Sequence, residues 1–327
     1  MVMKKSYTSK TQAYKLQPGS QIVGKWHKKT YRILKELGQG ATGIVYLAET
    51  NNQFVALKVG EDNMAIAAEV NVLKHFSKVQ GQVLGPSLLD VDDMQWIGKT
   101  VSFYAMEYLQ GKDLLTFVRD RGQEWIGIFI VQLLGDLDRL HRVGWVFGDL
   151  KPDNLMIVGP PPRVRWFDVG GTTLFGRSIK EFTEFYDRGY WGLGTRKAEP
   201  SYDLFAVAMI MINCFYPKRF DKKSDERPIQ QLKQAIEKEE GLRPFRMVLL
   251  YALQGKYKDA QAMRKDVMDV ISRQSSYEKQ PVEKKVVNQK QQRRVRPKKK
   301  SSYLVEILLI STFLLLIYVL YLYGQLL

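Results

Sequence analysis

Cysteine is almost absent from this sequence, since Cys214 is the only one among 327 residues. A single cysteine excludes an intramolecular disulfide, and its apolar neighbours predict a buried thiol, as suits a reducing cytosol. Histidine is nearly as scarce, and the positions of His27, His75 and His141 do not have the spacing of a zinc site. No apolar stretch follows the first lysines, so the amino terminus does not resemble a secretory signal.

Acidic residues are few relative to basic ones: 34 Asp and Glu stand against 50 Lys and Arg, a net charge of +16. The excess is concentrated between Lys279 and Lys300, where ten basic residues accompany one acidic residue, Glu283, for a local charge of +9. This stretch has no regular apolar period. We therefore expect a flexible basic linker over residues 274–302.

Only one nearly continuous apolar run is long, from Val305 to Tyr323; Glu306 is its one charged residue, and Ser311 and Thr312 are its only other polar side chains. About 19 residues of helix cover roughly 28 Å, which is near the thickness of a bilayer's hydrocarbon core. The run predicts a transmembrane helix over residues 303–324 in the cell membrane, with residues 325–327 outside. The basic residues before it place the preceding chain in the cytoplasm. A buried helix of a soluble core is the alternative, but no later segment of this sequence would cover it.

The most informative stretch runs from residue 145 to residue 170. Two apolar runs flank a Gly-Pro-Pro-Pro-Arg break, which predicts a strand, a turn and a strand. Asp149, Lys151 and Asn154 precede the first strand, and Asp168 follows the second. A hairpin brings its two open ends to one side, so these groups converge. Oxygen ligands for a divalent cation, an amine for a phosphate and a carboxylate to orient a hydroxyl are what phosphoryl transfer requires. Solvated turn residues are the plainer interpretation.

Gly148-Asp149-Leu150-Lys151-Pro152-Asp153-Asn154 resembles the catalytic loop of Hanks-type (eukaryotic-like) serine/threonine protein kinases, and Asp168-Val169-Gly170 resembles their metal-binding Asp-Phe-Gly. The resemblance covers about residues 24–273. It implies an α+β, bilobal kinase fold, with a small antiparallel β lobe carrying one helix (about 24–108) and a larger, mainly α lobe (about 109–273). Residues 1–23 are polar and are expected to be flexible.

A glycine-rich turn precedes these motifs, formed by Gly38, Gly40 and Gly43 and followed by Val45. A dinucleotide-binding turn would lead into a helix, whereas this one leads into β-branched residues and another strand. The resemblance implies that its backbone covers the phosphates of ATP. Glycines that merely permit a tight hairpin are the alternative.

Lys58 rises from an otherwise apolar strand, on the same face as Ala56, and an amine there needs an anionic partner. The candidate is Glu69, beside the apolar stripe of a helix predicted over residues 63–77. Glu61 is a second candidate, and Glu69 could instead be a solvated surface residue.

The resemblance also assigns the remaining nucleotide contacts. Met106 would be the gatekeeper, backbone groups of Glu107 and Leu109 would bind adenine, and Met156 would form the floor below the base. Asp168 and Asn154 would hold Mg²⁺ or Mn²⁺, Lys58 would fix the non-transferred phosphates, Asp149 would orient the acceptor hydroxyl, and Lys151 would neutralise charge on the γ-phosphate. Asp203 opens a run that is hydrophobic on every face and is predicted to be a central core helix. Asp203 would tie the catalytic loop to this helix; an ordinary helix cap is the alternative, and both roles could hold together.

The sequence departs from the family pattern at three places, and the first two affect regulation. Phe147-Gly148 replaces the family's His-Arg, so no cation adjoins Asp149 to pair with a phosphothreonine. Val169 replaces a phenylalanine. Ala198-Glu199-Pro200 has an altered order, so Glu199 is not assigned the family's structural role. The candidate autophosphorylation sites are Thr172, Thr173, Ser178, Thr183 and Thr195.

The arrangement of kinase, basic linker and terminal span resembles that of membrane-anchored sporulation kinases of bacilli. The sequence therefore predicts a membrane-anchored enzyme that phosphorylates Ser and Thr of proteins, including itself, and a homodimer is one possible assembly. A pseudokinase or a DNA- or lipid-binding scaffold is the main alternative, and a small-molecule phosphotransferase is disfavoured by the Lys-Pro-Asp-Asn sequence. The linker's ligand, anionic lipid or DNA, stays open. Its expected contacts are Arg293, Arg294, Arg296, Lys298, Lys299 and Lys300.

Overall fold

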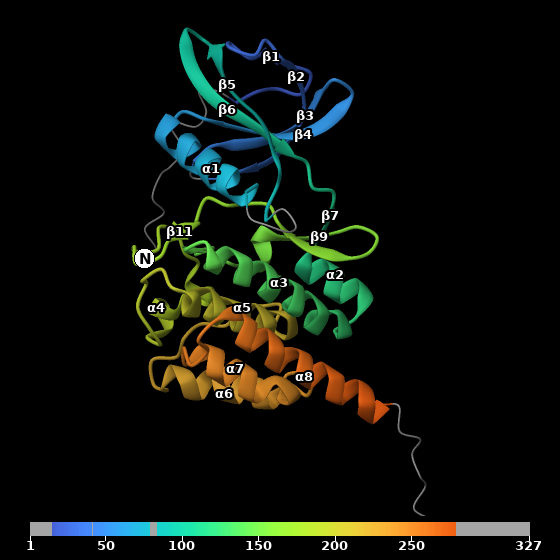
Figure 1. Cartoon of the computed structure of the whole chain (residues 1–327), viewed down its shortest axis with the longest axis vertical. Coiled ribbons are helices and arrows are strands. Elements are labelled where there is room, and N and C mark those ends of the chain that lie inside the picture. Colours follow the sequence, from blue (N-terminus) through green and yellow to red (C-terminus); the bar gives the residue numbers. More distant parts are fainter. Residues whose placement is uncertain (1–14, 41, 79–83, 279–327) are drawn as a thin grey trace, which may run out of the picture. The chain divides into compact units, whose positions relative to one another are not determined.

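The computed structural model describes residues 15–40, 42–78 and 84–278. In this part of the chain a β-sheet with one helix forms a small lobe, and a mainly helical large lobe follows it (Figure 1). This is the predicted bilobal arrangement. The flexible linker predicted over residues 274–302 begins within helix α8, Ala260–Glu278, so its first five residues are helical. The rest of the linker and the predicted membrane span, residues 303–324, lie outside the described residues. Among the residues that are described, no helix is long and apolar enough to cross a membrane.

The small lobe is an antiparallel sheet of six strands in the order β1-β2-β3-β4-β6-β5. Their bounds are Gln21–Val23 (β1), Thr30–Gln39 (β2), Ile44–Thr50 (β3), Gln53–Gly60 (β4), Leu88–Trp96 (β5) and Lys99–Glu107 (β6). Helix α1, Asn63–Phe76, follows β4, and the side chain of Asp62 caps its first turn. The glycine-rich turn joins β2 to β3, so it is a hairpin loop, as its β-branched flank predicts.

The small lobe begins earlier than predicted. β1 pairs with β2, and the buried Leu16 donates its N–H to the Tyr46 hydroxyl at 3.0 Å. The flexible segment predicted for residues 1–23 is therefore wrong for residues 15–23, and residues 1–14 lie outside the described part. A three-residue strand whose one buried side chain is Ile22 gives too weak a pattern to predict an edge strand.

The large lobe combines helices with short β ladders. Its helices are Leu114–Arg121 (α2), Glu124–Arg142 (α3), Arg188–Trp191 (α4), Pro200–Phe215 (α5), Pro228–Lys238 (α6), Arg246–Leu253 (α7) and Ala260–Glu278 (α8). Its strands are Gly111–Asp113 (β7), Trp145–Val146 (β8), Leu155–Val158 (β9), Arg163–Trp166 (β10) and Thr173–Leu174 (β11), with 3-10 turns at Pro152–Asn154 (η2), Glu184–Tyr186 (η3) and Arg243–Phe245 (η4). The predicted hairpin is the β9-β10 pair, with Leu155 opposite Trp166.

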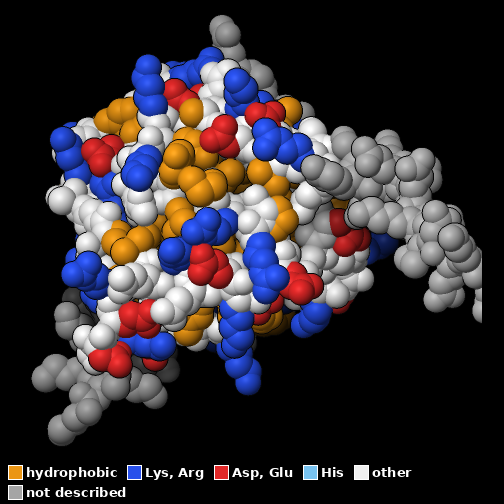
Figure 2. Space-filling model, turned by 90° about the horizontal axis from the view of Figure 1, so that it is seen from below, with side chains coloured by type: hydrophobic (Ala, Val, Ile, Leu, Met, Phe, Trp, Pro, Cys, Tyr) orange, Lys and Arg blue, Asp and Glu red, His pale blue; other side chains and the backbone are white. Residues whose placement is uncertain are grey.

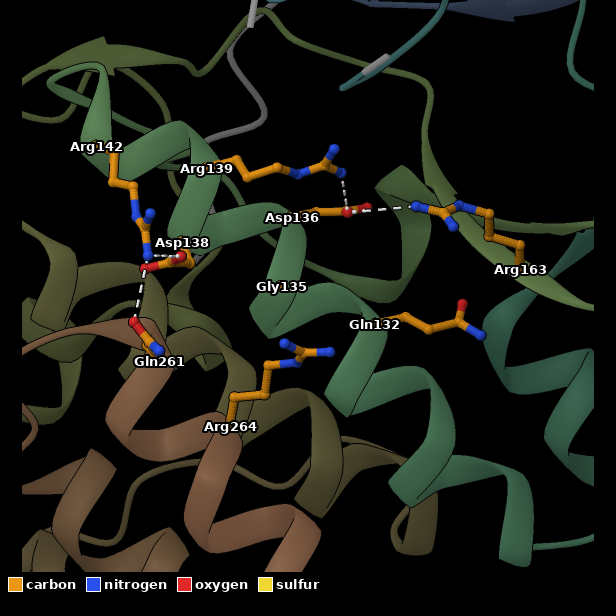
Figure 3. A pocket seen from close by; sticks show the side chains of 9 residues that line it. All are labelled: Gln132, Gly135, Asp136, Asp138, Arg139, Arg142, Arg163, Gln261 and Arg264. Carbon is orange, nitrogen blue, oxygen red and sulfur yellow. Dashed lines mark hydrogen bonds and ion pairs between the residues drawn. The ribbon is translucent and has the colours of Figure 1, made fainter. Parts of the chain in front are cut away.

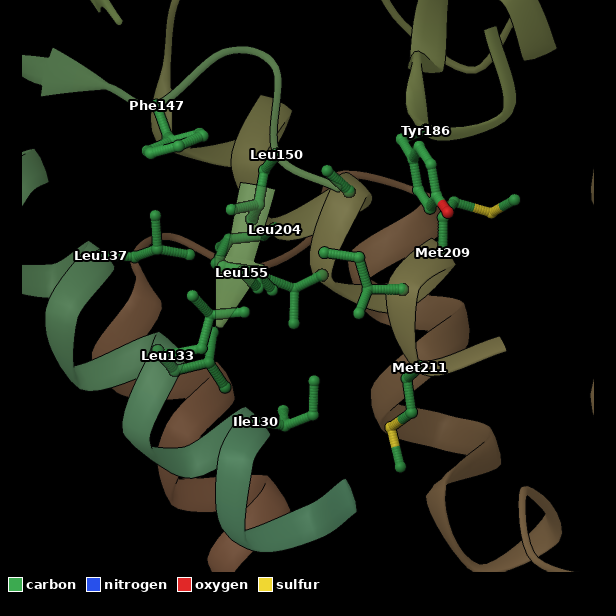
Figure 4. Packing of buried hydrophobic residues seen from close by; sticks show 14 of the residues in the cluster. Ile130, Leu133, Leu137, Phe147, Leu150, Leu155, Tyr186, Leu204, Met209 and Met211 are labelled. Atoms are coloured by element: carbon green, nitrogen blue, oxygen red, sulfur yellow. The ribbon is translucent and has the colours of Figure 1, made fainter. Parts of the chain in front are cut away.

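Helix α5 forms the centre of the large lobe, since every residue from Tyr202 to Cys214 is buried. It begins at Pro200, three residues before the predicted start at Asp203. Leucines of α3 pack against it together with Leu155 of β9 (Figure 4). Cys214 is buried as expected, and burial raises the pKa of its thiol to about 12.

The end of the large lobe mixes charges of both signs. Figure 2 looks at this end and shows basic and acidic side chains interspersed around an apolar area. Exposed apolar residues on α7 and α8 include Met247, Tyr251 and Met268. A mixed surface of this kind creates no strong field of one sign.

Candidate active site

A buried ion pair joins β4 to α1. Lys58 Nζ lies 2.7 Å from Glu69, and the two residues are 7% and 4% exposed. Glu69 is therefore the partner of Lys58, as predicted. Glu61 is not the partner, and Glu69 is not a solvated surface residue. A charge pair at this depth is stable only when further hydrogen bonds satisfy it.

Two residues that were not predicted from the sequence supply those bonds. Tyr104 of β6 donates its hydroxyl to Glu69 Oε2 at 2.7 Å, and Thr42 of the glycine-rich turn donates to Glu69 Oε1 at 2.8 Å. Burial raises the pKa of Tyr104 well above its ordinary value, and the charge of Glu69 adds to the shift, so the hydroxyl stays a donor. The sequence pattern that could have indicated Tyr104 is the alternation of side chains along β6, which places Tyr104 on the same face as Met106.

Asp203 fixes the backbone of the catalytic loop. Its Oδ2 accepts the Phe147 N–H at 2.8 Å, and its Oδ1 accepts the Gly148 N–H at 3.0 Å. His141, at the end of α3, lies 2.9 Å from Asp203 Oδ2. Asp203 lies inside the first turn of α5 and is not its cap, which is Glu199. The structure thus shows the tie that the resemblance implied.

The backbone conformation at position 148 explains why a glycine stands where the family has an arginine. Its φ is +85°, and a Cβ there would lie 2.5 Å from the carbonyl oxygen of Gly171. A Cβ on Gly171 would in turn lie 2.9 Å from that of Asp149. The catalytic loop and the loop after Asp168 therefore touch through two glycines, and an arginine at position 148 would not fit.

Asp149, Lys151 and Thr183 form one hydrogen-bonded group. Lys151 Nζ contacts Asp149 Oδ2 and lies 3.2 Å from the Thr183 hydroxyl, which lies 3.2 Å from Asp149 Oδ1. Asp149 is 9% exposed. Thr183 is one of the candidate autophosphorylation sites, and in this conformation its hydroxyl orients the carboxylate and the lysine.

Asn154 and Asp168, the predicted cation ligands, each keep an oxygen that could bind a cation. Asn154 Nδ2 donates to the Asp149 carbonyl at 2.8 Å, which leaves Oδ1 as the amide's acceptor. Asp168 is exposed, and its Oδ1 accepts the Gly170 N–H at 3.0 Å. An amide oxygen and a carboxylate suit Mg²⁺, which takes few protein ligands and keeps phosphate oxygens and waters. Within residues 15–40, 42–78 and 84–278 no three His, Cys, Asp or Glu side chains converge on a separate metal site.

Glu181 is a further carboxylate at this site that the sequence did not reveal. It is exposed to solvent, yet partial desolvation raises its pKa, and the charges of Asp168 and Asp149 raise it further. A Cβ added at Gly170 would lie 3.4 Å from both Asp168 Oδ1 and Glu69 Oε1 and 3.9 Å from Glu181 Oε2, so these three carboxylates border the same glycine.

The predicted adenine contacts lie around the end of β6. Ala56, Met106 and Leu109 are buried, and Val45, Glu107 and Met156 are partly buried, whereas Gly38 and Gly40 are exposed and have nothing within 4 Å of an added Cβ. Gly43 differs, because an added Cβ would lie 2.2 Å from the Val59 carbonyl oxygen. The Glu107 N–H donates to the Ser87 carbonyl at 2.8 Å, which removes that group from the predicted adenine contacts.

The Glu107 side chain has a different function, because it joins the two lobes. Arg165 of β10 donates to Glu107 Oε2 at 3.0 Å and to the Gly85 carbonyl at 2.7 Å. Burial would raise the pKa of Glu107, but its bonds to Arg165 and Ser87 outweigh burial and lower it.

The segment between η3 and α5 is held by two charged residues. The fully buried Asp187 accepts from the N–H groups of Gly189 and Tyr190, from Arg196 and from the Tyr202 hydroxyl. Arg188 donates to Glu199 Oε1 at 2.8 Å, and this bond lowers the pKa of Glu199. Glu199 thus pairs locally, consistent with not assigning it the family's role.

The candidate phosphorylation sites differ in accessibility. Thr172 and Thr173 are 0% and 1% exposed, so their hydroxyls cannot reach an active site in this conformation. Ser178 and Thr195 are exposed. The six basic linker residues from Arg293 to Lys300 lie outside the described residues.

A lysine-glutamate pair in a β lobe, facing an Asp-Lys-Asn-Asp set on a helical lobe, is the arrangement of a protein kinase. Sequence comparison agrees, since residues 31–303 match the protein kinase domain, and the chain belongs to that family. It is 52% identical over 288 residues to the serine/threonine-protein kinase YabT of Bacillus subtilis, an alignment that covers 88% of this chain and 84% of that protein. The predicted class, a Hanks-type serine/threonine protein kinase similar to YabT, is confirmed.

More distant relatives match a smaller part of the chain. The kinase cek1 of Schizosaccharomyces pombe is 31% identical over 134 residues, which cover 39% of this chain and 10% of cek1. A probable serine/threonine-protein kinase of Clostridium perfringens is 25% identical over 143 residues, 42% of this chain and 21% of its own length.

Proposed function

We propose that this serine/threonine kinase is anchored to the cell membrane by residues 303–324, uses ATP with Mg²⁺ or Mn²⁺, and phosphorylates itself as well as other proteins. The observation that carries the catalytic part is the pair of Asp149 contacts, because Lys151 and Thr183 hold the carboxylate beside the cation ligands. A role in sporulation, expected from the likeness to kinases of bacilli, belongs to the same proposal.

Each residue of the site has a role in this reaction. Lys58, held by Glu69, faces the non-transferred phosphates, and Lys151 neutralises charge on the γ-phosphate. Asp149 accepts a hydrogen bond from the Ser or Thr hydroxyl and thereby orients the hydroxyl oxygen toward the phosphorus of the γ-phosphate. Asp168 and Asn154 would hold the divalent cation, which supplies charge neutralisation between the phosphates.

An autophosphorylation assay tests the catalytic proposal. The full chain in detergent and residues 1–302 should both incorporate radiolabel from γ-labelled ATP, whereas Asp149→Asn should lose at least about a hundredfold in rate. Equal incorporation by Asp149→Asn would mean that another enzyme supplies the label. A folded protein that incorporates none would favour the pseudokinase alternative.

Membrane attachment has its own test. Full-length protein should sediment with membranes and dissolve only in detergent, whereas residues 1–302 should stay soluble at high salt. If both forms fractionate alike in 1 M salt, residues 303–324 are not the anchor.

The basic linker has the charge to bind a polyanion. Its charge favours DNA, through phosphates and without sequence preference, or anionic headgroups of the membrane. Neutralising Arg293 to Lys300 should weaken binding to both DNA and phosphatidylserine vesicles, and stimulation of kinase activity by only one of them identifies the regulator. Undiminished DNA binding rules the linker out as the DNA site.

A further inference from the structure

A hollow in the large lobe is lined by none of the catalytic residues. It has a volume of about 530 Å³ and is bordered by α3, β10 and α8. Figure 3 shows how the side chains of these three elements surround it. The residues that line it are Gln132, Gly135, Asp136, Asp138, Arg139, Arg142, Arg163, Gln261 and Arg264.

The lining is unusual because it contains no apolar or aromatic side chain. Pockets for drug-like molecules and for nucleotide bases are walled mainly by such side chains. A hydrocarbon ring would therefore find no apolar side chain to pack against. The lining instead offers guanidinium and amide N–H groups, which are donors to oxygen.

The lining residues carry a positive excess. Four arginines and two aspartates give 4 − 2 = +2. Asp136 is 7% exposed and pairs with both Arg139 and Arg163, the latter at 3.5 Å, and Asp138 pairs with Arg142 at 2.8 Å. One buried carboxylate thus holds two guanidinium groups in fixed directions, a preorganised arrangement that lowers the cost of binding an anion.

Arg264 supplies the remaining charge. It reaches from α8 toward α3, where its Nε donates to the Val131 carbonyl at 3.1 Å, and no carboxylate pairs with it within the described residues. Gly135 lies next to it, because a Cβ at Gly135 would lie 3.6 Å from the Arg264 guanidinium. Planar guanidinium groups bind phosphate oxygens in pairs, and a phosphoryl group carries about −1.5 to −2 at neutral pH, which matches the excess.

We propose that this arginine pocket binds a free phosphate-bearing anion, of the size of pyrophosphate or a small phosphorylated metabolite, independently of the kinase reaction. Arg163 and Arg264 are its principal ligands, and Asp136 orients Arg163.

The test measures binding of inorganic pyrophosphate to the full chain in detergent, by calorimetry at fixed ionic strength without divalent cations. Every variant keeps the catalytic site and the linker, so their contribution to pyrophosphate binding is common to all. Gly135→Ala should bind as the wild type does, because its methyl group makes only ordinary contact. Gly135→Glu places a carboxylate against Arg264 and should weaken binding at this site at least tenfold.

Variants that remove an arginine charge form the second part of the binding test. Arg264→Gln should also weaken binding about tenfold, whereas Arg246→Gln, which removes an exposed arginine paired with Glu237, should not. If Gly135→Glu fails to fold in a thermal melt, the two arginine variants decide. Equal binding by Arg264→Gln and Arg246→Gln overturns the proposal, and so does a phosphoserine peptide that binds where pyrophosphate does not.

Discussion

At the scale of single residues, two glycines in the same backbone conformation have different surroundings. Gly144 and Gly148 have φ of +82° and +85°, but an added Cβ meets nothing at Gly144 and lies 2.5 Å from the Gly171 carbonyl oxygen at Gly148. Gly144→Ala should therefore cost only about 1 kcal/mol of conformational strain. Gly148→Ala should cost about 2 kcal/mol or more and lower kcat at least tenfold, because the catalytic and metal loops must separate. Urea denaturation and steady-state kinetics of both variants measure the difference, and matching values would contradict it.

Tyr104 gives a second prediction at this scale. Tyr104→Phe removes one hydrogen-bond donor from the buried Glu69 carboxylate, which costs about 1 to 3 kcal/mol of stabilisation. Glu69 should then hold Lys58 less firmly in place. We expect the KM for ATP to rise several-fold with little change in the KM for a peptide substrate. Tyr108→Phe is the control, since the Tyr108 hydroxyl has no hydrogen-bond partner in the described part of the chain. A Tyr104→Phe enzyme with wild-type kinetics would show that Glu69 needs only Lys58 and Thr42.

The residues of the active site differ in how far the sequence alone predicts them. Lys58, Asp149, Asn154 and Asp168 stand in short motifs whose spacing reflects local strands and turns, so a local pattern is enough to predict them. Tyr104 and Thr183 reach the site across 35 and 34 residues from their partners, and no local pattern encodes such contacts. The positive φ of Gly148 is likewise a consequence of the loop it meets.

At the scale of secondary-structure elements, β10 connects the lobes through Arg165. This arginine contacts the end of β6 at Glu107 and the chain before β5 at Gly85. The Arg165→Lys variant keeps the charge but cannot bridge both acceptors, because an ammonium lacks the planar fork of a guanidinium. We expect a several-fold higher KM for ATP in Arg165→Lys and a larger increase in Arg165→Gln, with the peptide KM unchanged. Arg246→Gln, whose ion pair lies within the large lobe, should leave all constants as they are. A fall in kcat alone would assign Arg165 to the chemical step.

Several elements could be predicted at this scale, and two that were missed have physical reasons. The range predicted for α1 ends one residue beyond the helix, and the β9-β10 hairpin was expected from its apolar runs and proline-rich turn. The start of α5 was missed because Pro200 opens it, as a proline at the first helical turn often does, before the apolar run begins. β1 was missed because it has three residues and one buried side chain.

At the scale of the whole molecule, the nucleotide should stabilise both lobes together, because Lys58 belongs to the small lobe and Asp168 to the large one. A ligand that binds only the folded chain adds about 2.7 kcal/mol at a concentration about a hundred times its Kd. A non-hydrolysable ATP analogue with Mg²⁺ should therefore raise the melting temperature in a single transition, by a few degrees for a chain of this size. Chelating the cation with EDTA should remove most of the shift.

Variants in either lobe should reduce the rise in melting temperature that the ATP analogue produces. Lys58→Met and Asp168→Asn remove a phosphate contact and a cation ligand from opposite lobes, and each should reduce the shift to less than half. Lys35→Met, which removes an exposed lysine from β2, should leave it unchanged. A shift lost in one of the two variants but intact in the other would mean that the nucleotide binds to a single lobe, and that Lys58 and Asp168 do not act on the same phosphates.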